Sequence, residues 1–167
     1  AHIFEPGEVR HVHRVYRDLY TDQVWCMVGD LPNECKIVQT DNYFSSLQSV
    51  GGGDETWRCV SPLFTKNFVY YATDSEYLPR SIYRIDRRTN YREKIEDIDG
   101  PVYYATSVGE DLFFGVVVKG CPSQAEPCAS LWHLTANDSN LVARKIIQYR
   151  KDWFCPRIFL PGMLTFP

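Results

Sequence analysis

The sequence predicts an all-β fold of the β-propeller type: three four-stranded antiparallel blades and the first strand of a fourth. Short extended segments recur along the chain, and His11, Trp57 and Tyr103 stand 46 residues apart within them. Each recurrence holds four such segments, and four strands in roughly 40–50 residues is typical of a propeller blade. A single domain over residues 1–167 is expected, with blades at 9–50, 56–98 and 101–149 and the extra strand at 155–166.

The individual strands follow from short apolar and aromatic-rich runs between turn residues. First strands are expected at Val9–Tyr16, Thr56–Ser61 and Pro101–Ser107. Second strands are expected at the apolar runs Val24–Val28, Phe68–Ala72 and Leu112–Val116. Third strands are expected at Cys35–Thr40, Ser81–Asp86 and Ser130–Thr135, and fourth strands at Phe44–Val50, Arg92–Ile98 and Leu141–Tyr149. No window of twelve or more residues has a clean helical period.

Three blades are too few to close a ring, because propellers usually have four to eight. The exposed sheet edges and faces would then need covering. Either the chain is a piece of a longer protein or copies associate. A two-fold dimer is the simplest closure, since three blades are half of a six-bladed ring.

The charge and hydropathy of the sequence argue against two classes of partner, nucleic acids and membranes. The net charge is −3, and basic and acidic residues are interleaved, which argues against nucleic acid. The longest apolar run is far below the twenty residues of a membrane span, so no membrane partner is expected.

The six cysteines predict one disulfide. Cys121 and Cys128 flank a short loop, and a bond between them is geometrically easy. Its oxidation would favour an extracellular or periplasmic location; otherwise a cytoplasmic one is expected. Cys26 and Cys59 lie in expected strands and are interpreted as small core residues. The sequence leaves the pairing of the other cysteines, Cys35 and Cys155 among them, open.

The candidate ligand-binding residues are His11, His13, Arg58 and Tyr103, which lie on or beside the expected first strands. Alternate residues of a strand share one face, so the two imidazoles could converge and hold a metal or supply a base. No acid shares their strand and Arg10 and Arg14 flank them, so neither a metal nor another cofactor is predicted.

Aromatic and acidic side chains add to this picture. The Tyr103 ring suits stacking on a sugar, although packing between blades explains it equally well. Asp30 and Asp74 follow second strands and are interpreted as turn residues that could reach the same end of the ring.

Several segments resemble sialidase-like (BNR-repeat) propeller proteins. They are Arg10–Trp25, ending near Gly29-Asp30, then Thr56–Thr65 and Tyr71–Asp74. The family's Asp-box has the form Ser-x-Asp-x-Gly-x-Thr-Trp, and the nearest match, Val50–Trp57, keeps only Thr-Trp and is interpreted as a glycine-rich connection. The resemblance implies a propeller that binds a carbohydrate or another hydroxyl-rich or anionic ligand at the channel mouth.

Whether the protein is an enzyme stays open. A glycoside hydrolase or lyase whose site is completed by another chain or a missing segment is one alternative, and a non-catalytic protein-interaction or assembly module is another. No catalytic residue is assigned, because the first strands carry no acid to form a carboxylate pair.

Overall fold

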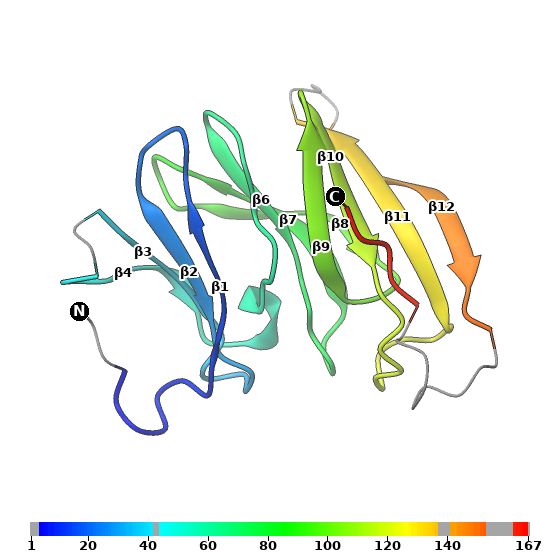
Figure 1. Ribbon diagram of the computed structural model, residues 1–167, viewed down its shortest axis with the longest axis horizontal. Helices are drawn as coiled ribbons and strands as arrows, with labels where there is room; N and C mark the ends of the chain where they lie inside the picture. Colours follow the sequence, from blue (N-terminus) through cyan, green and yellow to red (C-terminus); the bar gives the residue numbers. More distant parts are fainter. Residues whose placement is uncertain (1–3, 42–43, 137–140, 153–161, 167) are drawn as a thin grey trace.

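The computed structural model describes residues 4–41, 44–136, 141–152 and 162–166. In this part of the chain, twelve strands form three four-stranded antiparallel sheets that lie side by side (Figure 1). Sheet 1 is β1 (Val12–Arg17), β2 (Val24–Val28), β3 (Lys36–Thr40) and β4 (Gln48–Gly52). Sheet 2 is β5 (Leu63–Phe64), β6 (Phe68–Ala72), β7 (Arg80–Asp86) and β8 (Arg92–Ile98). Sheet 3 is β9 (Val102–Val108), β10 (Asp111–Val116), β11 (Cys128–Thr135) and β12 (Arg144–Arg150).

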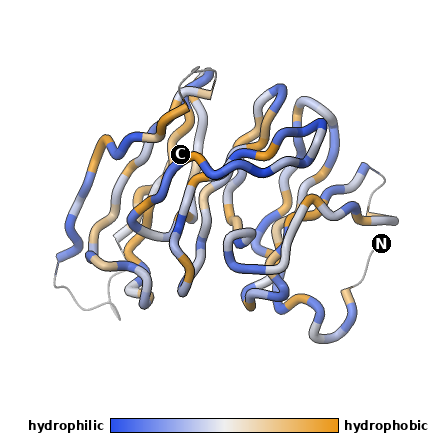
Figure 2. Tube along the Cα trace, turned by 180° about the vertical axis from the view of Figure 1, so that it is seen from behind, coloured by the Kyte–Doolittle hydropathy of each residue, from blue (hydrophilic) through white to orange (hydrophobic). Residues whose placement is uncertain are grey.

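Sheet 2 is buried on both faces, which explains why its strand β6, Phe68–Ala72, is apolar throughout. Alternate residues of a strand point to opposite faces. Tyr70 and Ala72 of β6 accordingly pack in the cluster shared with sheet 3, while Val69 and Tyr71 pack in the cluster shared with sheet 1. Hydrophobic and hydrophilic segments alternate along the trace in Figure 2, and strongly polar strands such as β8 and β12 lie among the apolar ones. The three sheets therefore pack face to face around two apolar layers.

The outer sheets have one packed face and one largely open face. In β2, Trp25 and Met27 face sheet 2, while Cys26 and Val28 lie on the other side under Phe4 and partners from nearby loops. In sheet 3, Gly115 lies close to the backbone of Leu164, so the segment 162–166 crosses part of its outer face (Figure 1). All seven residues of β12 are exposed.

Most of the expected strands are confirmed, but the strand expected at Phe44–Val50 begins only at Gln48, in β4, and one expected strand does not form. Residues 24–28, 68–72 and 92–98 form strands with the expected bounds. The expected strand at Thr56–Ser61 is wrong: Glu55–Trp57 form a 3-10 turn, η1, capped by the Asp54 carboxylate, and the first strand of sheet 2 is β5 at Leu63–Phe64. Trp57 packs there against Gly51, where a Cβ atom would lie about 2.1 Å from the indole. Only an isolated bridge, Cys59 to Thr73, precedes β5.

The disulfide between Cys121 and Cys128 is not formed. Both thiols are free, and they have different partners: Cys121 Sγ accepts a hydrogen bond from Arg80, and Cys128 Sγ donates to Glu126. Cys26 and Cys59 are buried in apolar clusters, as expected.

Two further expectations concern the extra strand near the C-terminal end and the lack of a membrane span. Much of the extra strand expected at 155–166 lies outside the described residues, and residues 162–166 form no strand. No helix in the described part has the length and apolar content needed to cross a membrane.

A buried ion pair holds sheets 1 and 2 together at the end opposite the site described below. The Asp18 carboxylate, fully buried, accepts hydrogen bonds from both terminal nitrogens of Arg87, and Arg87 Nε donates to the Thr65 carbonyl at 2.8 Å. Burial raises the pKa of Asp18, but bonds from Arg87, Thr21 and the Tyr20 amide outweigh that effect and lower it.

Asp18→Asn is expected to destabilise the protein by about 3 kcal/mol, because it leaves the Arg87 guanidinium without its charged partner. The matched control is Asp22→Asn, which removes an exposed pair with Arg17 and should cost less than about 1 kcal/mol. Asparagine also tolerates the positive φ of 63° at that position. Urea unfolding measures both, and equal effects would show that the Asp18 pair contributes no more than a surface pair.

Candidate functional site

The four predicted ligand-binding residues lie together along one cavity of about 400 Å³. It lies where β1 and β9 begin, beside the segment before β5 and the loop after β6. Its lining is His11, His13, Arg14, Arg58, Val60, Asp74, Tyr103 and Tyr104. The cavity therefore draws side chains from all three repeats.

One backbone hydrogen bond, repeated in each sheet, places these side chains. The Gly29 amide donates to the His11 carbonyl at 3.0 Å, the Asp74 amide to Arg58 at 2.9 Å, and the Val117 amide to Pro101 at 2.9 Å. His11 and Arg58 are therefore structurally equivalent residues of consecutive repeats. The uniform 46-residue spacing in the sequence misses this alignment by one or two residues.

Arg58 lies at the centre of the site and links sheets 1 and 2. Its Nη2 donates to Asp30 Oδ1 at 2.9 Å, and its Nη1 lies 3.4 Å from Glu76 Oε1. Its Nε lies 3.4 Å from Asp74 Oδ2 and makes no hydrogen bond. The guanidinium is buried and faces three carboxylates, so its charge is already balanced by protein groups and is not available to an acidic ligand.

Lys119 extends the network to sheet 3. Its Nζ lies 2.7 Å from Glu76 Oε1 and 3.4 Å from Asp74 Oδ1. The hydrogen bond from Lys119 lowers the pKa of Glu76. Burial raises the pKa of Asp74 to about 6, against the attraction of Arg58 and Lys119, because its ionic contacts are long. A carboxyl with such a value exchanges protons near neutral pH.

Two buried glutamates hold the loops that carry these acids. Glu34 Oε2 accepts hydrogen bonds from the amides of Arg10, Asp30 and Leu31 at 3.2–3.4 Å. Burial raises the pKa of Glu34, but these bonds outweigh that effect and lower it. Glu55 Oε2 accepts in the same way from the amides of residues 76, 77 and 78 at 3.0–3.3 Å. Each acidic loop is thus fixed by a carboxylate that bonds consecutive amides.

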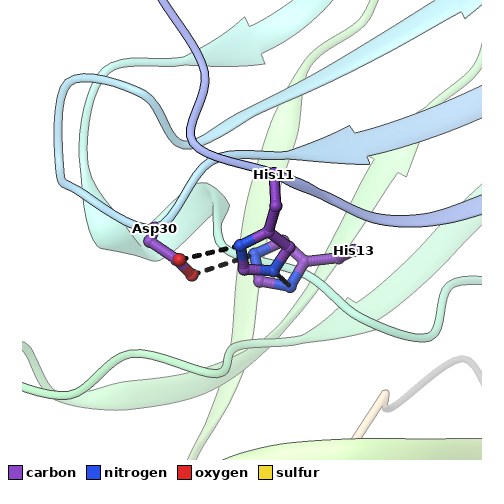
Figure 3. A group of neighbouring side chains, drawn as sticks. All are labelled: His11, His13 and Asp30. Carbon is purple, nitrogen blue, oxygen red and sulfur yellow. Dashed lines mark hydrogen bonds and ion pairs between the residues drawn. The ribbon is translucent and has the colours of Figure 1, made fainter. Parts of the chain in front are cut away.

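His11, His13 and Asp30 form a compact cluster (Figure 3), and the two histidines line the cavity. His11 Nδ1 lies 2.8 Å from Asp30 Oδ2, and His11 Nε2 lies 3.2 Å from His13 Nδ1. His13 Nε2 lies 2.8 Å from the Gly29 carbonyl, which can only accept a hydrogen bond. Burial lowers the pKa of His13, so its neutral form with a proton on Nε2 is favoured.

The aromatic wall comes from β9. Tyr103 and Tyr104 are half-buried, and the Tyr103 carbonyl accepts a hydrogen bond from Ser61 at 2.7 Å. The Lys119 ammonium lies 5.7 Å from the centre of the Tyr103 ring. Trp57, by contrast, stacks on Tyr71 and does not line the cavity.

The sequence predicted the aromatic and basic residues of the site. It did not predict that acidic residues surround Arg58. Asp30 and Asp74 were expected as turn residues that could reach one end, and both do contact Arg58. Glu76 and Lys119 were missed, since both lie in irregular loops with no motif. The acid that the histidines lacked on their own strand comes from the loop after β2.

The comparisons with known proteins give a fold neighbour and no family. No family model and no curated protein match the chain. Among solved structures, it is similar to a crystal structure of the eukaryotic initiation factor, with 14% identity and a TM-score of 0.51. The match covers 84% of this chain and 33% of that one, so this chain spans about a third of that protein. At this identity the likeness concerns the fold alone.

The free energy of unfolding of the wild type, measured relative to that of Asp74→Asn, is expected to fall as the pH rises from about 4 to about 6. The folded state retains on Asp74 a proton that the unfolded chain releases near 3.8, so rising pH favours unfolding in that window. The difference between the two proteins should change by roughly 2–3 kcal/mol.

Unfolding in denaturant at several pH values measures this change. Asp111→Asn is the control of opposite sign, since hydrogen bonds from His133 and Thr135 lower the pKa of Asp111. A pH-independent difference for Asp74→Asn would mean that Asp74 is ionised throughout.

Proposed function

We propose that the cavity binds a small hydroxyl-rich ligand, a carbohydrate being the best fit. The observation that carries the proposal is the composition of the cavity wall. Two half-buried tyrosines line the cavity of about 400 Å³ together with imidazole, guanidinium and carboxyl groups. Sugars offer apolar C–H faces for rings and hydroxyls that both donate and accept hydrogen bonds.

The charge balance favours a neutral ligand over an acidic one. Asp30, Asp74 and Glu76 already surround Arg58, and Lys119 is held by two of them. A ligand carboxylate would therefore have to compete with protein carboxylates for the same cations. Hydroxyl groups face no such competition.

A glycoside hydrolase is the second candidate, because Asp74 lines the cavity and its pKa is raised to about 6. A general acid for glycosidic cleavage needs a raised pKa of this kind. Asp30, which contacts Arg58 Nη2 just outside the cavity lining, would be the partner carboxylate. In this alternative the acids come from the loops after the second strands and not from the first strands.

The wider architecture that we propose is a sialidase-like propeller. Three face-to-face four-stranded sheets, each repeating the same backbone bond at the same end, suit three consecutive blades. The remaining ring would come from a second copy or from further blades of a longer chain. The exposed apolar side chains of β12, Ile146, Ile147 and Tyr149, support such a neighbour.

Tyr103→Ala is expected to weaken binding of a glycan about fivefold to tenfold, because it removes a stacking ring worth about 1–1.5 kcal/mol. A glycan array with the wild type identifies the probe, and calorimetry then compares the variants. Tyr91→Ala, which removes an exposed tyrosine far from the cavity lining, should bind like the wild type.

Binding unaffected by Tyr103→Ala would place the ligand elsewhere. A wild type that binds no glycan would favour the protein-interaction or assembly alternative. Release of reducing sugar from a bound glycan would favour the hydrolase.

The mass in solution is expected to be twice the 19.4 kDa of one chain if a second copy covers the open sheet faces. Light scattering measures it. Charged substitutions at Ile147 and Tyr149 should then reduce the mass to that of one chain without unfolding it. A stable wild-type monomer would contradict closure by a second copy.

A further inference from the structure

The histidine pair has an arrangement that protein hydrogen bonds alone explain poorly. Asp30 Oδ2 and the Gly29 carbonyl are both acceptors, and each lies 2.8 Å from a ring nitrogen of its own histidine. With one proton per neutral ring, these contacts place the protons on His11 Nδ1 and His13 Nε2. The two remaining nitrogens, His11 Nε2 and His13 Nδ1, then lie 3.2 Å apart, and each carries a lone pair and no proton.

This separation suits two ligands of one metal ion. Nitrogens bonded to zinc at about 2.0–2.1 Å lie roughly 3.3 Å apart when the geometry is tetrahedral. The acceptors behind the rings also match a metal site, because a ligating histidine usually donates its other N–H to a carboxylate or a backbone carbonyl. Here Asp30 has that role for His11 and Gly29 for His13.

The surrounding charges leave room for a cation. Within the network around Arg58, three carboxylates, Asp30, Asp74 and Glu76, contact two permanent cations, Arg58 and Lys119, so this network carries one excess negative charge when Asp74 is ionised. Arg14 is a third permanent cation on the cavity wall, but its side chain is exposed and donates to the Tyr16 hydroxyl at 3.1 Å, so water screens its charge. Within the described chain, His11, His13 and Asp30 are also the one group whose possible ligand atoms all lie within 4.8 Å of one another.

We propose that His11 Nε2 and His13 Nδ1 bind a divalent transition metal such as Zn²⁺ at the edge of the cavity. Asp30 orients His11 and contributes negative charge. The other coordination positions face the cavity, where water or a ligand hydroxyl can occupy them. Imidazole ligands favour Zn²⁺, Co²⁺, Ni²⁺ or Cu²⁺ over Mg²⁺ and Ca²⁺. This site does not rest on the carbohydrate proposal, because metal uptake alone tests it.

The experiment titrates EDTA-treated, dialysed protein with Zn²⁺ by calorimetry and with Co²⁺ by visible absorption. One ion per chain is expected, with Co²⁺ d–d bands that a nitrogen-ligated ion gives, and no uptake of Mg²⁺. His11→Gln and His13→Gln should each abolish the uptake. Asp30→Asn should weaken it 10- to 100-fold, the usual effect of removing a carboxylate behind a ligating histidine.

The matched control is His133→Gln. His133 also pairs with an aspartate, Asp111, at 2.8 Å, but it lies on β11 away from the cavity, so this variant should bind the metal like the wild type. Circular dichroism verifies that each variant is folded. Of the two ligand positions, the half-exposed His11 is the one whose substitution should disturb folding less.

Three results would overturn the proposal. One is no Zn²⁺ or Co²⁺ uptake by the wild type, together with nitrogen NMR showing both His11 nitrogens protonated at neutral pH. In that case a shared proton, and not a metal, joins the two rings. The second is full uptake by folded His11→Gln, and the third is an equal loss in His133→Gln.

Discussion

The site depends on a buried guanidinium. Arg58 is 8% exposed, and removing such a charge from water is favourable only when acceptors surround it. Asp30 supplies one from sheet 1, and Asp74 and Glu76 supply two from the loop after β6. Apolar packing between sheets has no direction, so it tolerates sliding. An ion pair with hydrogen-bond geometry does not, and Arg58 therefore fixes how sheets 1 and 2 are aligned at the cavity.

The repeat explains how such a site can arise from similar units. The same amide-to-carbonyl bond closes each sheet at this end, so the backbone offers three equivalent positions. They hold His11, Arg58 and Pro101, three residues of unlike chemistry on one scaffold. Buried glutamates then fix the adjoining loops, Glu34 beside Asp30 and Glu55 beside Glu76. Rigid backbone with varied side chains is the usual basis of a binding site on a repeated fold.

The strands could be predicted from the sequence because their signal is local. The run Phe68–Ala72 is apolar throughout, as a strand buried on both faces must be, and it forms β6 with the expected bounds. The error at Thr56–Ser61 was also local: Asp54 caps a turn that the extended interpretation overlooked. The contacts of the acidic residues around Arg58 could not be predicted from a local signal. Lys119 meets Glu76 across 43 positions of sequence, and nothing near either residue indicates that contact.

The balance of charge in the cavity decides which ligands it can distinguish. Among the groups that contact one another around Arg58, the three carboxylates outnumber Arg58 and Lys119 by one when Asp74 is ionised, and protonation of Asp74 near its pKa of about 6 removes that excess. Binding of a cation beside His11 and Asp30 would compensate for the same charge. A proton and a metal ion are therefore competing ways of neutralising one cluster. The neutral, hydroxyl-rich ligand that we propose would suit either state, because its hydroxyls donate to a carboxylate and accept from a protonated acid or coordinate an ion.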